Sequence, residues 1–441
     1  MPLSESVIRR MTRLANEHGA INLAQGFTDE PPAYPLVWGA IAALLGGSDA
    51  GIRRLEQVTA AGLGAHPSIP GAAPATAGGP QVGTDPAARL GDALRLLQGT
   101  PDELNQYSYP FGLPELRRAI ARYTALWSGF EPDPETETTV VLGSTEGLAA
   151  TLAALGRPGD GLVVMEPFHE MYPAQAEVFG LTPRFVTLRE AADGSGWHLD
   201  PDEVRRAADG ARFLVLNPPH NPTGKVFEPA ELASIADVAH AHDLVVITDE
   251  IYEHVVFDGA RHRSLATLDG MRERTVVVNS ISKTANATGW RVGWVLAPPH
   301  LTPAIRAVHD TLVIQAPTPL QKAAVTLLDM PAEFFRSLAD GFAAKRALLG
   351  GALRGAGFRL TEPRGAYYLF ADYRGVPSIG HLAPMAAAVR LIEDAGVAAV
   401  PGDNFYGRSA EGARYLRFAF CRSRATLGAA AERLRRLARV A

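Results

Sequence analysis

The fold is decided by a short apolar run that ends near a lysine, in residues 276–294, VVVNSISKTANATGWRVGW. The three valines at 276–278 are typical of a strand that is buried on both faces. Lys283 comes just past this strand, where desolvation would lower the pKa of its amine and favour its use as a nucleophile. Arg291 lies eight residues further on and offers a forked donor for a phosphate group. Taken alone, a lysine in such a place is more often a solvated loop residue.

Similar apolar runs recur before this segment and alternate with helical patterns. They are residues 140–142, 162–165, 213–216 and 244–247, with helices predicted at 147–155 and 229–242. An amphipathic helix is also predicted after Pro114, with Leu116, Ile120 and Tyr123 at helical spacing. Unalternating apolar strands separated by helices favour a mostly parallel sheet that is covered on both faces. The predicted fold class is therefore α/β.

Residues that follow such strands are candidate site residues, because open α/β sheets bind ligands at the carboxyl ends of their strands. The run 140–142 is followed by GSTE, where Ser144, Thr145 and the amides of a helix N-terminus suit a phosphate. A simple N-cap is the alternative. The run 213–216 is followed by NPPHNPTG, in which the prolines restrict the backbone and Asn221 offers an amide. A tight turn is the alternative there.

The run 244–247 is followed by TDEIY at 248–252. Burying Asp249 at a strand end is costly unless the carboxylate meets a cation. A protonated pyridine nitrogen would be such a cation, and Tyr252 could reach the same ligand. A pair of surface carboxylates is the alternative for this segment alone. The combination of four such segments in this order predicts one shared site.

Composition excludes several classes of protein. Of the 441 residues, 47% are hydrophobic and 20% are charged, which is typical of a packed globular chain. A net charge of −5 and the lack of a basic run with aromatics argue against nucleic acid as a partner. Cys421 is the single cysteine, so neither an intrachain disulfide nor a cysteine-based metal site is expected. Without a signal-like or membrane-spanning stretch, a cytoplasmic protein is expected.

The chain is expected to divide into four parts. Residues 1–45 would join the small domain, 104–304 would form the large domain with the sheet, and 305–441 would form a smaller α/β domain. Residues 46–103 are predicted to be an insertion, because 19 of the 29 residues from 59 to 87 are Ala, Gly or Pro. A flexible surface loop is the favoured interpretation, and a lid or a partner-binding element over the site is the alternative.

These motifs together resemble the class I/II aminotransferases, pyridoxal-phosphate (PLP) enzymes of fold type I, and most of all the kynurenine and glutamine transaminase branch. The pieces that carry the resemblance are NLAQGF at 22–27, NQYS at 105–108, NPPHNPTG at 217–224, DEIY at 249–252, SISK at 280–283, and Pro401-Gly402 with Arg417. The resemblance implies amino transfer between an α-amino acid and a 2-oxo acid. It also implies a large domain with a mostly parallel sheet plus a smaller α/β domain.

The resemblance implies a role for each matching residue. Lys283 would carry PLP as a Schiff base and then act as general base, while Asp249 would keep the pyridine nitrogen protonated. The ring would then be an electron sink. Tyr252 and Asn221 would bind the phenolic oxygen of the cofactor. The phosphate would be held by Ser144, Thr145, Ser280 and Arg291.

The remaining roles concern the substrate and a second subunit. Tyr107 would reach the phosphate in the neighbouring subunit, which implies a homodimer with shared sites. Arg417 would bind the substrate α-carboxylate with Gly26 behind it, although an arginine in an apolar strand could instead pair with a buried structural carboxylate. Cys421 is expected to be a small buried residue and not a nucleophile.

Two departures from the family pattern leave the substrate and reaction open. His169 occupies the position that usually stacks an aromatic ring on PLP, so it could stack, which we favour, or transfer protons. The insertion at 46–103 precedes Tyr107. Amino transfer is the leading hypothesis; elimination, replacement or cyclisation at the same cofactor is the alternative, and a non-catalytic PLP-fold module is a remote one.

Overall fold

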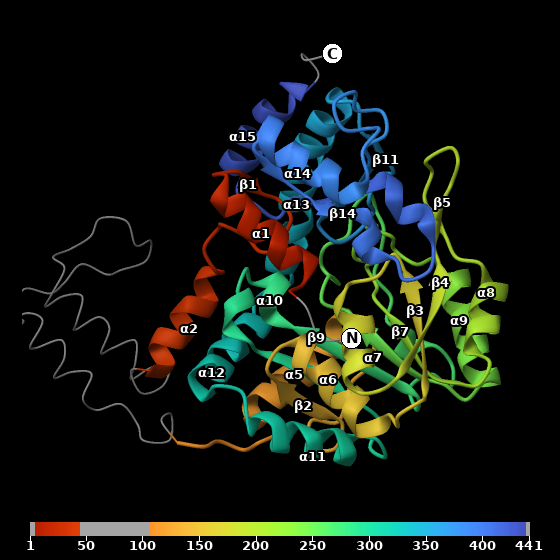
Figure 1. Cartoon of the computed structure of the whole chain (residues 1–441). Helices are drawn as coiled ribbons and strands as arrows, with labels where there is room; N and C mark the ends of the chain where they lie inside the picture. The colour runs from red at the N-terminus through yellow and green to blue at the C-terminus, as the bar shows by residue number, and fades with distance from the viewer. Residues whose placement is uncertain (1–4, 45–105, 438–441) are drawn as a thin grey trace, which may run out of the picture.

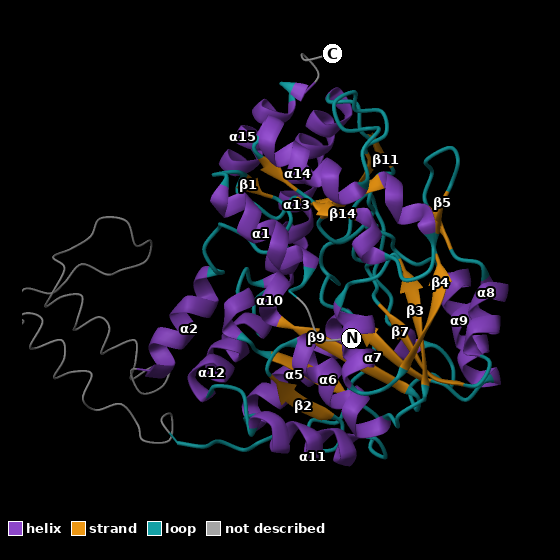
Figure 2. Cartoon of the chain, viewed as in Figure 1, coloured by secondary structure: helices purple, strands orange, loops and turns teal. Residues whose placement is uncertain are grey.

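The computed structural model describes residues 5–44 and 106–437. Its centre is a seven-stranded sheet with the strand order β2-β10-β9-β8-β7-β3-β4, drawn in orange in Figure 2. The strands are β2 (Thr138–Val141), β3 (Gly161–Glu166), β4 (Thr182–Thr187), β7 (Ala211–Leu216), β8 (Val245–Asp249), β9 (Thr275–Ser280) and β10 (Gly293–Leu296). The five strands from β9 to β4 in this order pair in parallel. The predicted fold class is confirmed.

The antiparallel strand is β10, which pairs with β9 on one side and β2 on the other. Residues 293–296 and 182–187 form strands that were not predicted from the sequence. The first of these follows β9 after residues 281–292, whose helical turns at Ile281–Thr284 and Thr288–Trp290 are too short to cross the face of the sheet, so the chain reverses direction and β10 runs antiparallel to β9.

Alternate side chains of the sheet pack into separate cores on its two faces. Leu162 and Val164 of β3 lie in one hydrophobic cluster with Leu148, which belongs to helix α6 (Ser144–Leu155). Val163 lies in another cluster with Ile235 of α9 (Pro229–Ala241). Burial on both faces explains why these strands lack polar alternation. Helix α11 (Thr302–Val313) backs α6, and α8 (Pro201–Ala208) packs beside α9.

A second, smaller sheet lies above the large one in Figure 1. Its strand order is β11-β12-β15-β14, with bounds β11 (Arg359–Leu360), β12 (Tyr368–Asp372), β14 (Val400–Pro401) and β15 (Tyr415–Ala419). The helices of this part are α13 (Ala332–Gly355), α14 (Pro384–Ala395) and α15 (Arg424–Leu434). Helix α1 (Val7–Glu17) packs on β14, and β1 (Ile21–Asn22) pairs with β13 (Val397–Ala398).

The helices just after residue 304 stay with the large sheet. Helix α11 contacts β2, and α12 (Thr318–Leu328) contacts α5 (Pro114–Trp127) and α2 (Tyr34–Leu44). We therefore propose that the smaller domain begins with α13, later than expected. The insertion predicted at 46–103 lies outside the described residues. Within the described ranges, no helix is both long and apolar enough to cross a membrane.

Candidate active site

A cavity of about 490 Å³ lies between the carboxyl edge of the large sheet and the smaller domain. Every sequence-predicted site residue except Tyr107 lines it, namely Gly26, Ser144, Thr145, His169, Asn221, Asp249, Tyr252, Ser280, Lys283, Arg291 and Arg417. Residues nearly 400 positions apart in the sequence thus meet in one place. Ile8 and Arg9 of helix α1 and its N-cap residue, Ser6, also line the cavity.

Lys283 lies on α10 (Ile281–Thr284), the single helical turn that directly follows β9. Its Nζ donates a hydrogen bond to the carbonyl oxygen of Gly26 at 3.0 Å. Burial lowers the pKa of this amine to about 8, although nearby Cys421 and Asp249 oppose the shift. About half of the amine is therefore uncharged near pH 8, which suits a nucleophile or a base.

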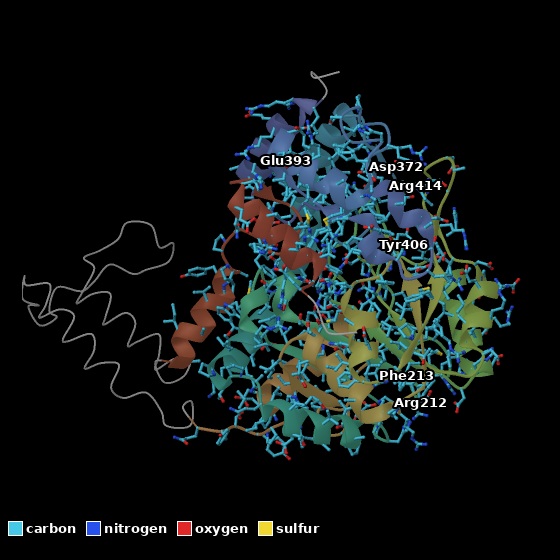
Figure 3. The ribbon with its side chains drawn as sticks, in the orientation of Figure 1. Arg212, Phe213, Asp372, Glu393, Tyr406 and Arg414 are labelled. Carbon is cyan, nitrogen blue, oxygen red and sulfur yellow. The ribbon has the colours of Figure 1, made fainter. Side chains whose placement is uncertain are left out.

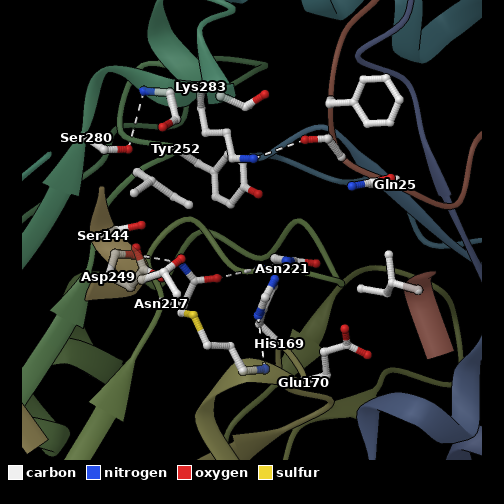
Figure 4. A pocket seen from close by; sticks show the side chains of 18 of the residues that line it. Gln25, Ser144, His169, Glu170, Asn217, Asn221, Asp249, Tyr252, Ser280 and Lys283 are labelled. Atoms are coloured by element: carbon white, nitrogen blue, oxygen red, sulfur yellow. Dashed lines mark hydrogen bonds between the residues drawn. The ribbon is translucent and has the colours of Figure 1, made fainter. Parts of the chain in front are cut away.

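Asp249 ends the neighbouring parallel strand, β8, and is 4% exposed. Its Oδ2 accepts a hydrogen bond from the Tyr172 hydroxyl at 2.9 Å, whereas Oδ1 is buried without a hydrogen-bond partner among the described residues. Burial raises the pKa of Asp249 to about 6, while the Tyr172 hydrogen bond and Lys283 act in the opposite direction. Figure 4 shows Asp249 and Lys283 entering the cavity from different sides. A buried acceptor left open in this way is costly unless a ligand donates to it.

Ser144 and Thr145 begin α6, and Gly143 precedes them with φ +77°. A Cβ at residue 143 would lie 2.4 Å from Nη2 of Arg291, so only glycine lets this arginine approach the helix end. Arg291 itself donates to the carbonyl oxygens of Thr288 and Leu142 at 3.0 Å each. An arginine beside a helix N-terminus and two hydroxyls is suited to binding a dianionic phosphate.

Asn221 and Tyr252 are held by neighbouring polar groups. The backbone amide of Asn221 donates to Oδ1 of Asn217 at 2.9 Å, and Asn217 Nδ2 donates to the carbonyl oxygen of Asp249 at 2.6 Å. The hydroxyls of Tyr252 and Tyr368 lie 3.0 Å apart. These bonds connect the turns that follow β7 and β8 with β12 of the smaller domain.

Arg417 lies on β15 and is 1% exposed. Its Nη1 donates to Oδ1 of Asn221 at 3.0 Å, and its Nη2 donates to the carbonyl oxygen of Ala24 at 2.8 Å. No carboxylate pairs with it among the described residues, and its buried Nε has no hydrogen-bond partner there. The alternative of a structural carboxylate partner is therefore unsupported. A buried cation without a counter-ion is expected to bind an anionic ligand.

Gly26 allows Tyr367 and Tyr368 of the smaller domain to pack directly against its backbone. A Cβ at this position would lie 2.0 Å from the hydroxyl oxygen of Tyr368, so any other residue would displace that tyrosine. The carbonyl oxygen of Gly26 also accepts a hydrogen bond from the Tyr367 hydroxyl at 3.0 Å.

His169 lines the floor of the cavity below Asn221 in Figure 4. Its Nδ1 lies 3.2 Å from the backbone nitrogen of Met171. Because a backbone N–H can only donate, Nδ1 must accept, so the proton of the neutral ring is on Nε2. Burial lowers the pKa of His169 to about 3, and repulsion from Arg417 and Lys283 adds to the effect. The ring is therefore uncharged at physiological pH.

Comparison with known proteins identifies the family of this chain. The family model of aminotransferase class I and II matches residues 82–434. The chain belongs to the class I and II aminotransferases. It is therefore a PLP-dependent enzyme that transfers an amino group between amino acids and 2-oxo acids, as the resemblance implied.

Individual relatives resemble this aminotransferase over most of their length. A probable N-succinyldiaminopimelate aminotransferase (DapC) of Mycobacterium tuberculosis is 34% identical over 99% of this chain and 97% of the relative. Human kynurenine–oxoglutarate transaminase 1 is 34% identical over 76% of this chain and 85% of the relative. The solved structure of the M. tuberculosis N-succinyldiaminopimelate aminotransferase matches with a TM-score of 0.81 at 34% identity, covering 100% of this chain and 98% of that one.

Sequence reasoning missed several polar residues of the aminotransferase site. Tyr172 contacts Asp249, Tyr368 contacts Tyr252, and the buried Oγ of Ser282 faces the cavity region without a partner among the described residues. A serine two positions after Ser280 was visible in the SISK segment. The two tyrosines had no such signal, because nothing in a local pattern shows that distant hydroxyls converge.

Tyr107 lies outside this cavity and is 78% exposed. Its predicted contact with the phosphate belongs to a neighbouring subunit, and a single chain cannot make it. The role of Tyr107 stays a prediction.

Replacing His169 with phenylalanine distinguishes its two expected roles. We expect the pH profile of kcat to keep both its acidic and its basic limb and kcat to fall by less than about tenfold. An imidazole with a pKa of about 3 is uncharged near neutral pH and is too weak a base to take up a proton there. A fall of about 10²–10⁴-fold together with the loss of one limb would identify His169 as an acid or base instead. Steady-state kinetics from pH 5 to 9 on both proteins provides the comparison.

Proposed function

We propose that this cavity is the aminotransferase active site, with Lys283 holding the aldehyde of PLP and Asp249 facing its ring nitrogen. The observation that carries the proposal is the open Oδ1 of Asp249 in the same cavity as the Lys283 amine. Asp249 ends β8 and Lys283 follows β9, and these two strands are adjacent and parallel; the backbones of neighbouring strands in a sheet lie about 4.8 Å apart. A single flat ring can therefore contact both side chains.

The other residues of the cavity fit the remaining groups of this cofactor. The helix end at Ser144 and Thr145, with Ser280 and Arg291, offers hydroxyl, amide and guanidinium donors for the phosphate. Asn221 and Tyr252 supply donors for the phenolic oxygen, and His169 supplies a flat neutral ring for stacking. The Oγ of Ser282, which has no hydrogen-bond partner among the described residues, adds a further donor next to those of the proposed phosphate site.

Each protein group has a distinct chemical task in amino transfer. When bound, the cofactor takes up the electron pair left on the substrate α-carbon. Nζ of Lys283, once free, accepts the proton from that carbon and can return it at a neighbouring position. Asp249 stabilises positive charge on the ring nitrogen. Arg417 holds the α-carboxylate, which orients the α-carbon towards Lys283.

We further propose that the enzyme accepts amino acids with a long, acidic side chain. Arg9 lines the cavity and is exposed, and its side chain makes no hydrogen bond or ion pair with another described residue. A second cation at a distance from Arg417 would select a substrate with two carboxylates. The full-length similarity to a probable N-succinyldiaminopimelate aminotransferase supports the same class of substrate.

A homodimer is also proposed, in which Tyr107 of one subunit reaches the site of the other. Its 78% exposure and its place outside the cavity of its own chain support this arrangement.

The test is a panel of amino donors that follows the absorbance of the bound cofactor. One equivalent of 2-oxo acid should form without an acceptor, and turnover should require an added 2-oxo acid. N-Succinyl-L,L-diaminopimelate should be the best donor, with methionine and kynurenine as neutral comparisons. Arg9→Ala should raise KM for the acidic donor about tenfold, as expected for the loss of one charge-assisted bond, and leave KM for methionine unchanged. An equal effect on both donors would contradict the role of Arg9, and release of 2-oxo acid over many turnovers without an acceptor would contradict amino transfer.

A further inference from the structure

Glu166, the last residue of β3, is fully buried and is not explained by the reaction. Its carboxyl group accepts four hydrogen bonds. The Thr187 hydroxyl donates at 2.8 Å, and the other three donors are the backbone amides of Gly407, Arg408 and Ser409, at 2.8, 3.1 and 3.1 Å. A buried carboxylate that receives three consecutive amides is a strong anchor for the segment that carries them.

The anchored segment comes from the smaller domain and passes next to Arg417. Strand β14 places Val400 opposite Arg417 in the sheet, and the short helix η4 (Gly402–Phe405) follows directly. Phe405, at its end, is fully buried, and its ring centre lies 4.8 Å from the guanidinium carbon of Arg417. Tyr406, the next residue, is labelled in Figure 3 at the junction of the two domains.

A second bond fastens the same segment to the end of β3. The backbone amide of Phe168 donates to the carbonyl oxygen of Phe405 at 2.8 Å. Phe168, two residues after Glu166, thus ties the large domain to Phe405, the residue whose ring contacts Arg417. The guanidinium is packed between the rings of Phe405 and Tyr368, the latter centred 4.4 Å away.

We propose that Glu166 is a positioning residue for the substrate carboxylate site: it holds the 402–409 segment so that Phe405 keeps Arg417 oriented. The proposal rests on the proposed binding of the α-carboxylate by Arg417. Glu166 does not line the cavity, so it acts only through the segment it anchors. A small displacement of a binding group can cost a large factor in productive binding.

A purely structural role would have a different signature. All four partners of Glu166 are donors, so the amide of Glu166→Gln would face at least one of them with an N–H group and release part of the segment. That change lowers thermal stability under either interpretation. Only a positioning role also weakens the binding of the amino acid while the cofactor stays bound as before.

The test compares Glu166→Gln with Asp258→Asn in the PLP-loaded enzyme. Asp258 is a carboxylate that pairs with Arg346 of α13, so it joins the two domains through that helix and not through residues 402–409. For Glu166→Gln we expect KM of the amino donor to rise at least about tenfold with kcat changed less than about threefold. This pattern is expected when a variant weakens the binding of the substrate and of the transition state equally. The PLP dissociation constant, measured by fluorescence quenching, should stay unchanged, and Asp258→Asn should keep the wild-type KM.

Two more variants make each outcome decisive. Phe405→Leu removes the ring beside Arg417 and should raise KM similarly, so it serves as the test if Glu166→Gln does not fold. Unchanged KM in the folded variants, or an equal rise in Asp258→Asn, would overturn the positioning role. Arg417→Lys should raise KM strongly because lysine cannot form the forked pair. If it does not, the proposed carboxylate site is wrong, whatever Glu166 does.

Discussion

Lys283→Ala is expected to reduce kcat for amino transfer by at least about 10²–10⁴-fold, the usual contribution of proton transfer alone. The change removes the amine whose pKa burial lowers to about 8, and with it both the covalent attachment of the cofactor and the base. Purified Lys283→Ala should also lack the absorbance band of the lysine-bound cofactor. Single-turnover absorbance measurements with an amino donor give both results in one experiment.

Chemical rescue provides the control for Lys283→Ala. Methylamine added to the variant should restore part of the rate, because a small free amine can occupy the emptied space and accept the proton. Lys283→Arg should remain inactive, since its guanidinium stays protonated. A Lys283→Ala enzyme that kept wild-type kcat and the lysine-bound absorbance would refute the proposed active site.

Asp249→Asn is expected to lower kcat by about 10³-fold. A carboxylate about 4 Å from a ring cation is worth about 4 kcal/mol at an effective dielectric of 20, and each 1.4 kcal/mol corresponds to a tenfold change in rate. The amide has the same size and can still accept the Tyr172 hydrogen bond, so folding should be little affected. Tyr172→Phe, which removes that bond and keeps the charge, should cost far less. Equal losses in the two variants would contradict the role of the charge.

The difference in PLP affinity between the wild type and Asp249→Asn is expected to depend on pH. Burial raises the pKa of Asp249 to about 6 in the free protein, so the wild type must lose a proton before it binds a protonated ring at lower pH. The affinity advantage of the wild type over Asp249→Asn should therefore be full above pH 7 and should shrink as pH falls through 6. Titration of both proteins with PLP from pH 5 to 8 gives the ratio of their PLP dissociation constants at each pH. The protonation of Lys283 affects both proteins, so its effect largely cancels in this ratio. A ratio that does not change with pH would show that Asp249 is not the group concerned.

Local patterns were sufficient for the sheet and for most of the cavity. The apolar runs at 140–142, 162–165, 213–216, 244–247 and 276–278 coincide with strands of the large sheet, except that Leu142 and Leu244 lie one residue outside β2 and β8. Polar residues such as Ser144, Asn221, Asp249 and Lys283 lie at the ends of those strands or within five residues after them. Parallel strands bring their carboxyl ends to one edge, so proximity at that edge could be derived without coordinates.

Other features had no local signal. The amides that bind Glu166 follow it by about 240 positions, and Tyr368 reaches Tyr252 from another domain. The sequence does not show whether His169 is charged. In the structure its ring is buried and its Nδ1 accepts a hydrogen bond from a backbone amide, so the ring is neutral.

The sequence by itself determined the α/β class, the edge of the sheet where ligands bind, and the lysine and carboxylate that meet there. These follow from hydrophobic periodicity and from the geometry of parallel strands, which act over a few residues. Only the tertiary structure decided which groups lack partners, how Arg417 is oriented and what the His169 ring can donate. Such properties depend on burial and on contacts between distant segments, because the free energy of a charge or a hydrogen bond is set by its whole surroundings.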